Sequence, residues 1–167
     1  MNVAVQLEPA DGAPAEVEFR WDTDTDILTA RLRNGPHGQG MSGSVELSGA
    51  DGSWVILDVK AGSIAGVEVA VWPEVRKVPT LSPPPEIDDA RVVVPERRSQ
   101  PGIALLSVDT KLHADADEAE RTIHFTLDGS RAGRTVRIAR DVLLDLDDES
   151  VVTGLWLLNV PPFPTAE

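Results

Sequence analysis

The sequence predicts a mainly β protein with little or no helix, built from two related antiparallel β-meanders packed as a sandwich or a pseudo-twofold barrel. Three observations predict this class. Apolar and polar residues alternate with a period of two in segment after segment, which is typical of half-buried strands. Turn residues such as those at 50–52 separate these segments. The ends of the two halves of the chain also resemble one another.

Five strands are predicted in the first half. In the first of them, Val17, Phe19 and Trp21 point to one face and the charged residues between them to the other. Polar residues at 23–26 predict a turn, and the glycine-rich residues 34–43 predict a loop. Pro73 ends the last strand, because proline cannot donate a ladder hydrogen bond. The predicted strands are Val17–Asp22, Ile27–Leu32, Ser44–Leu47, Ser53–Val59 and Ile64–Trp72.

A proline-rich segment divides the chain. Seven of the 13 prolines lie between residues 73 and 101, and Pro83 to Pro85 force an extended backbone. Ala90–Val94 is the one short strand predicted there. We therefore expect a first meander over 1–75, a crossover over 76–101 and a second meander over 102–167.

The second half has a similar but less regular pattern. Ala114–Glu120 is acidic and alanine-rich, so one helical turn or a loop is expected there. Prolines 161 and 162 end the last predicted strand. The predicted strands are Ile103–Val108, Thr122–Leu127, Thr135–Ala139, Val142–Leu146 and Val151–Val160.

The two halves share a spacing that suggests a degenerate internal duplication. Asp58 precedes Gly66 by eight residues, and Asp145 precedes Gly154 by nine. In both halves a proline follows the glycine after seven residues. Two copies of one meander could pack face to face, each covering the apolar surface of the other.

Four short motifs in residues 18–73 resemble a known family. They are Phe19-Arg20-Trp21-Asp22, then Asp26-Ile27-Leu28, then a strand from Gly52 that ends in Asp58, and then Gly66-Val67-Glu68-Val69. This order resembles the small bacterial family catalogued as domain of unknown function 2283. The resemblance implies a short β-rich fold without an established activity and, more weakly, an antitoxin-like or binding role. Residues 103–162 resemble a degenerate second copy, in which Trp156 stands where Glu68 would recur.

Charge and composition exclude several classes of function. With 15 Lys and Arg against 28 Asp and Glu, the net charge is −13, which opposes binding to nucleic acid or to an anionic membrane. The absence of cysteine excludes disulfides, thiolate metal sites and a cysteine nucleophile. No signal peptide and no apolar run long enough to span a bilayer is apparent, so we expect a cytoplasmic protein.

The sequence contains no recognisable catalytic or metal-binding motif, so we expect no enzyme, no cofactor and no metal. Asp22, Asp24 and Asp26 lack the glycine and glutamate of a calcium loop and suit a turn with backbone-capping carboxylates. Glu68 and Asp58 are the one nearby carboxylate pair, and either an ion pair of Glu68 with Arg20 or Arg31 or a solvent-facing position is possible. Arg137 is expected to pair with an acidic residue.

Three tryptophans are the candidate interface residues, together with Glu68 and Asp58. Trp54, Trp72 and Trp156 each lie in a strand rich in valine or leucine, and Trp54 and Trp156 fall opposite the main apolar face. A tryptophan there either covers a second hydrophobic layer or anchors an interface, where this residue is enriched. The leading hypothesis is a non-enzymatic protein-interaction module, antitoxin-like or self-associating. The alternative is a β-sandwich that binds a small ligand or a carbohydrate.

Overall fold

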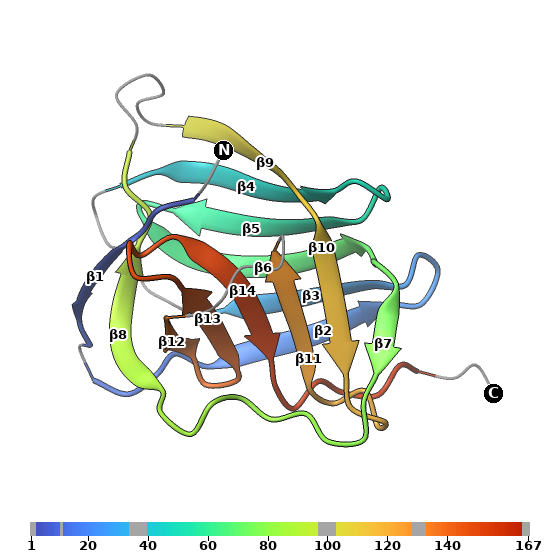
Figure 1. Ribbon diagram of the computed structural model, residues 1–167. Helices are drawn as coiled ribbons and strands as arrows, with labels where there is room; N and C mark the ends of the chain where they lie inside the picture. The colour runs from blue at the N-terminus through green and yellow to red at the C-terminus, as the bar shows by residue number, and fades with distance from the viewer. Residues whose placement is uncertain (1–2, 11, 34–39, 97–102, 128–132, 165–167) are drawn as a thin grey trace.

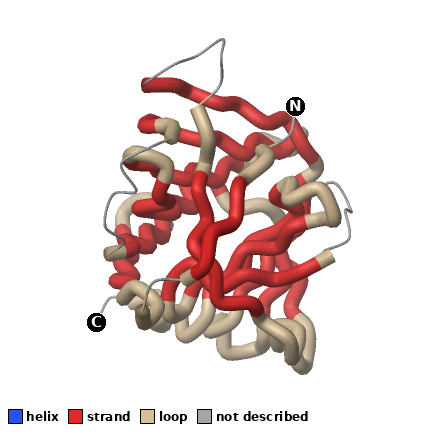
Figure 2. Tube along the Cα trace, turned by 90° about the vertical axis from the view of Figure 1, so that its left-hand side faces the viewer, coloured by secondary structure: helices blue, strands red, loops and turns tan. Residues whose placement is uncertain are grey.

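A computed structural model describes residues 3–10, 12–33, 40–96, 103–127 and 133–164 of the chain. The described residues form strands, turns and loops without any helix (Figure 2), which confirms the predicted mainly β class. The first seven strands are β1 (Gln6–Pro9), β2 (Val17–Asp22), β3 (Ile27–Leu32), β4 (Ser42–Gly49), β5 (Trp54–Lys60), β6 (Ser63–Val71) and β7 (Val75–Lys77). The next seven are β8 (Asp88–Val93), β9 (Ile103–Thr110), β10 (Leu112–Ala116), β11 (Ile123–Leu127), β12 (Arg134–Ala139), β13 (Val142–Leu146) and β14 (Val152–Leu157).

The strands form two open mixed sheets. The eight-stranded sheet has the order β1-β8-β12-β13-β14-β11-β10-β7, and the six-stranded sheet has the order β2-β3-β6-β5-β4-β9. Most pairs are antiparallel, while β4·β9, β8·β12 and β7·β10 are parallel. Of the two arrangements that the sequence left open, the protein therefore adopts the sandwich and not the closed barrel.

The two sheets pack face to face with their strands crossing (Figure 1), and one hydrophobic core lies between them. Alternate residues of each strand point into it, as the period-two pattern predicts. Leu28 and Val67 enter from the six-stranded sheet, and Phe125 and Leu155 enter from the eight-stranded sheet. Each sheet thus covers the apolar face of the other.

The chain changes sheet at four places, namely between β1 and β2, between β6 and β7, between β8 and β9 and between β9 and β10. The second and the fourth of these connections are short. β6 leads through Pro73 into β7, and β9 leads through Lys111 into β10, so each continuous segment contributes a strand to both sheets. In addition, β1 joins the eight-stranded sheet although it belongs to the first 75 residues. The proline-rich residues 78–87 run from β7 to β8 along the lower end of the eight-stranded sheet in Figure 1. The domain limits near residues 75 and 101 stay a prediction, although both halves share the core.

Three short segments differ from the expectations. The helical turn expected at Ala114–Glu120 is wrong, because Leu112–Ala116 forms β10 and pairs with β11 along its length. The loop alternative holds only for residues 117–120, which connect β10 to β11. Ala114 and Ala116 are buried there, so pairing and burial override their helical propensity. β1 and β7 are not predicted from the sequence, because they are too short to show a period. Residues 34–39 of the predicted glycine-rich loop lie outside the described residues.

The strand orders of the two sheets share a common part. β2-β3-β6-β5-β4 in one sheet has the same order of successive strands as β10-β11-β14-β13-β12 in the other. A register shift follows Asp58 where β5 pairs with β6, and one follows Asp145 where β13 pairs with β14. Asp58 pairs with Gly66, and Asp145 pairs with Gly154. The register therefore allows residues of the two sheets to be compared one by one.

The tight turn between β4 and β5 yields a prediction on pH. The hydroxyl and the backbone N–H of Ser53 donate to Asp51 and lower the pKa of its carboxyl below the usual 3.8. Since the folded state lowers this pKa, the carboxylate stabilises the fold above the unfolded pKa, and that contribution is lost as the pH falls through the folded pKa. We expect Ser53→Ala to raise the pKa of Asp51 toward 3.8, measured by an NMR pH titration of the carboxyl carbon. An unchanged midpoint would contradict the assigned cause.

Candidate functional site

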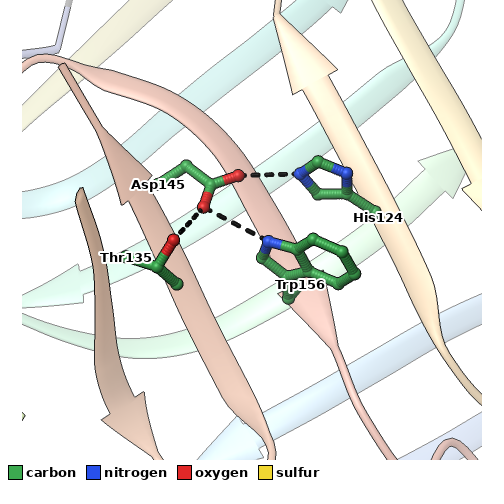
Figure 3. Close-up of polar contacts among 4 residues, drawn as sticks. All are labelled: His124, Thr135, Asp145 and Trp156. Carbon is green, nitrogen blue, oxygen red and sulfur yellow. Dashed lines mark hydrogen bonds and ion pairs between the residues drawn. The ribbon is translucent and has the colours of Figure 1, made fainter. Parts of the chain in front are cut away.

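A buried carboxylate organises the outer face of the eight-stranded sheet. Asp145 on β13 is 3% exposed and accepts three hydrogen bonds from side chains on β11, β12 and β14 (Figure 3). The donors are the Thr135 hydroxyl at 2.8 Å, the His124 ring nitrogen Nε2 at 2.7 Å and the Trp156 indole N–H at 3.2 Å. Burying a carboxylate is costly unless it is hydrogen-bonded, and these donors satisfy both of its oxygens.

Aromatic rings close this site against solvent. The rings of His124 and Trp156 stack with centroids 3.8 Å apart and an angle of 11° between their planes. Trp156 is 5% exposed, and Leu143 beside it on β13 is fully buried. Neither Trp156 nor Leu143 belongs to the core between the sheets. They form a second apolar layer on the opposite face, which is one of the two roles that the sequence left open for this tryptophan.

Gly154 is required by the position of Asp145. A Cβ at residue 154 would lie 2.5 Å from the Asp145 Oδ2 atom and 2.8 Å from the Phe125 carbonyl oxygen. Both separations are far below van der Waals contact. The glycine therefore leaves the space that the carboxylate needs in order to reach its three donors.

The corresponding positions of the six-stranded sheet carry a different set of side chains. Asp58 pairs with Gly66 as Asp145 pairs with Gly154, and Ser44 stands opposite Asp58 where Thr135 stands opposite Asp145. Thr29 and Glu68 face each other across β3 and β6, where the second sheet has His124 and Trp156. The stacked aromatic pair is thus replaced by two smaller or more polar residues.

The outer face of the six-stranded sheet is open at this point. A groove of about 930 Å³ runs over β3, β5 and β6. Ile56 and Gly66 are apolar parts of its lining, whereas Arg31, Asp58 and Glu68 bring charges of both signs. Arg33 and Lys60 also line it, and Arg33 is paired with Glu18 at 3.5 Å. Within the described part of the chain, Arg31, Asp58, Lys60 and Glu68 form no ion pair.

The structure thus brings together two of the five predicted site residues. Asp58 is exposed and Glu68 half-buried in the groove, and the described residues include no ion pair of Glu68 with Arg20 or Arg31. Trp156 lies on the other sheet, inside the closed site around Asp145. Trp54 is half-buried on β5, and its buried indole nitrogen has no hydrogen-bond partner among the described residues.

Trp72 lies in an aromatic cluster at one end of the sandwich. Its ring stacks on Trp21 with centroids 5.7 Å apart and lies 5.9 Å from Phe125. Its indole N–H donates to the Asp26 carbonyl at 2.8 Å, and that of Trp21 donates to the Pro161 carbonyl at 2.8 Å. Phe163 packs edge-on against Trp21. This cluster attaches the C-terminal segment to β2.

Other candidate residues have local partners. Asp22 accepts the backbone N–H of Asp24 at 3.0 Å, as a capping turn requires. Arg137 lies 3.9 Å from Asp89 and also donates to the Arg140 carbonyl. The described residues contain no group of three or more His, Asp or Glu side chains arranged to hold a metal ion. They also contain no helix long and apolar enough to cross a membrane.

No pattern in the sequence predicts His124 and Thr135 as partners of Asp145. Thr135 and Asp145 are directly opposed on β12 and β13, but His124 lies on β11, two strands away from Asp145. The only signal available was the recurrence of an aspartate before a strand glycine in both halves. That signal marked Asp145 and Gly154, but not the side chains that donate to the carboxylate.

A scan against models of known protein families finds no match to the chain, and a search of curated proteins finds none either. The resemblance of residues 18–73 to domain of unknown function 2283 therefore stays a prediction.

The two strand glycines yield a matched pair of substitutions. We expect Gly154→Ala to lower the free energy of unfolding by about 3 kcal/mol, because the new Cβ collides with a carboxylate and a backbone carbonyl. Gly66→Ala should be neutral or stabilising by up to about 1 kcal/mol, because its Cβ meets nothing closer than 3.4 Å. Urea denaturation of both variants measures the difference. Equal losses would contradict the distinct surroundings of the two glycines.

The hydrogen bond from the Trp156 indole N–H to Asp145 can be tested by a second pair of substitutions. Trp156→Phe keeps an aromatic ring but removes one donor to the buried Asp145 carboxylate, so we expect a loss of about 2 kcal/mol of stability. Trp54→Phe is the control, because the Trp54 indole nitrogen has no partner to lose among the described residues. A smaller loss is expected for it in thermal or urea unfolding. A larger loss for Trp54→Phe would refute the assigned role of the Trp156 N–H.

Proposed function

We propose that this chain is a non-enzymatic protein-interaction module that binds a partner through the groove of the six-stranded sheet. One observation carries the proposal. At matching positions of the two sheets, one carboxylate is enclosed by the chain's own aromatic rings, whereas the other, Asp58, stands in an open groove. Charged side chains that have no partner of their own in a groove are suited to pairing with another molecule.

We further propose that the two related meanders arose by an internal duplication. The shared order of five strands, the paired aspartate and glycine and the register shift after each aspartate support it. In this interpretation, one copy was filled by Trp156 and His124 for stability, and the other kept its site open for binding. This division of roles would explain why Glu68 does not recur in the second half.

A protein partner suits the groove better than a small ligand. Its volume of about 930 Å³ has room for a peptide segment, and its lining reaches Ser44 on β4, which pairs with Leu105 on the edge strand β9. Leu105 on β9 is 56% exposed, on the edge that a partner would contact. The net charge of −13 disfavours nucleic acids, anionic membranes and acidic proteins as partners. We also propose a cytoplasmic location. The small-ligand or carbohydrate alternative has less support, since the described residues that line the groove include no aromatic ring.

A hydrolase has weaker support, although Asp58 and Glu68 line the same groove. A two-carboxylate mechanism needs one carboxyl group held protonated as a general acid, which usually requires an apolar enclosure. Asp58 is exposed and the groove is open to solvent. Binding rather than acid catalysis is therefore the proposed role of these two carboxylates.

The proposal is tested by a charge placed in the groove. Ile56→Arg sets a long cation in its middle, so we expect loss of most partner capture in a tagged pull-down from native lysate, with far-UV circular dichroism unchanged. Thr126→Arg is the control, at a half-buried position on the outer face of the other sheet. Capture that is lost with Thr126→Arg and kept with Ile56→Arg would move the interaction to the eight-stranded sheet. Saturable binding of a sugar or metabolite at the groove, without any protein captured, would favour the alternative.

A further inference from the structure

We propose that the groove receives a tryptophan side chain of a different protein, seated over Gly66 with its indole N–H donating to Asp58. The inference rests on the proposed function and adds to it the chemistry of the partner. The chain itself provides the template, because the matching place in the eight-stranded sheet is occupied by an indole.

The template is the site around Asp145. There the Trp156 indole N–H donates to the carboxylate at 3.2 Å, the indole stacks on His124, and the Thr135 hydroxyl completes the site (Figure 3). In the six-stranded sheet, Asp58 provides the carboxylate and Ser44 the hydroxyl at the same register. Thr29 and Glu68 do not provide rings. An indole from outside would replace the ring that this sheet lacks.

The glycine at position 66 supports the proposed tryptophan site independently of this comparison. Glycine inside a strand weakens it, and it often marks a position where another group approaches closely. Gly66 does not have a positive φ, and its Cβ would meet only the Ala30 carbonyl oxygen at 3.4 Å and the Asp58 Cβ at 3.6 Å. Alanine would thus fit the protein on its own. The bare backbone at Gly66 therefore leaves space beside Asp58 that an incoming side chain can enter.

Charge favours a neutral ring over a cation. Arg31 and Lys60 balance Asp58 and Glu68 in the groove, and Arg33 is already paired with Glu18. An incoming arginine or lysine would meet two cations, whereas an indole provides an N–H donor without charge. The flanking charges of both signs can then pair with neighbouring residues of the partner segment.

The indole has to come from another kind of protein. The chain has four tryptophans, and the N–H groups of Trp21, Trp72 and Trp156 are all hydrogen-bonded within it. The nitrogen of the fourth, Trp54, is buried. A second copy of the chain therefore has no tryptophan free to insert.

In the test, the full chain is titrated with three capped tripeptides, and binding is measured by two-dimensional ¹H–¹⁵N NMR. The probes are Gly-Trp-Gly, its 1-methyltryptophan analogue, which lacks the indole N–H, and Gly-Arg-Gly. We expect Gly-Trp-Gly to bind with a dissociation constant near the millimolar range and to shift the amide signals of Thr29, Asp58 and Gly66. The methylated probe should bind about tenfold more weakly, because a hydrogen bond to a carboxylate is lost.

Two variants complete the test. Asp58→Ala removes the acceptor at an exposed position and should weaken Gly-Trp-Gly about tenfold. The double variant Thr29→His, Glu68→Trp reproduces the residues of the closed site, so it should fold and lose the probe entirely. Glu46→Ala is the control. Glu46 lies on the same face of β4 as Ser44 but does not line the groove, so this variant should bind Gly-Trp-Gly as the unaltered chain does.

The proposal is overturned if the methylated probe binds as well as Gly-Trp-Gly, if Gly-Arg-Gly binds more tightly, or if the filled double variant still binds. Shifts confined to the eight-stranded sheet would overturn it as well. If partner capture depends on Ile56 but no tripeptide binds, the proposed tryptophan ligand is rejected and the proposed function is kept. Tripeptide binding without any captured partner would reject the proposed function instead.

Discussion

The mutual burial of two crossed sheets is the constraint on which the rest of the structure depends. Each sheet has one face of Val, Leu, Ile and Phe side chains, and neither could stay in water alone. Packing them together fixes which face of every strand points inward. It also fixes which residues remain on the outer faces, so the positions of Asp58 and Asp145 follow from the alternation that builds the core. Because the chain passes between the sheets at Pro73 and at Lys111, the halves cannot separate without breaking strand pairs.

The outer faces of the two sheets carry different side chains at matching register positions. On the eight-stranded sheet, a second apolar layer of Leu143 and Trp156 covers the strands and encloses the Asp145 carboxylate among three donors. On the six-stranded sheet, the same register holds Ile56, Glu68 and Asp58 in an open groove. The first arrangement makes the carboxylate part of the folded structure. The second leaves a carboxylate, a hydroxyl and a bare glycine backbone facing solvent, and such groups are available to a partner.

Much of the fold was predictable from local patterns. The alternation of Val17, Phe19 and Trp21 located β2, and that of Val55, Leu57 and Val59 located β5, because a strand buries every second residue. β10 was missed because alanine and aspartate favour other structures in isolation, and only its pairing with β11 makes it a strand. β1 and β7 are too short to show a period. The recurring spacing of an aspartate before a strand glycine marked Asp58 and Asp145, but nothing local showed that Trp156 is enclosed within its own chain or that His124 reaches Asp145.

The sequence by itself determined the class of fold, the positions of most strands and the recurring spacing of an aspartate before a strand glycine, because these depend on neighbours a few residues apart. The tertiary structure alone decided that the two sheets cross over one core and that β9 and β10, continuous in the chain, belong to different sheets. It also decided which of the two aspartates is enclosed. That outcome depends on side chains from four strands meeting on one face, and the distances between those side chains exist only once the sheet has formed.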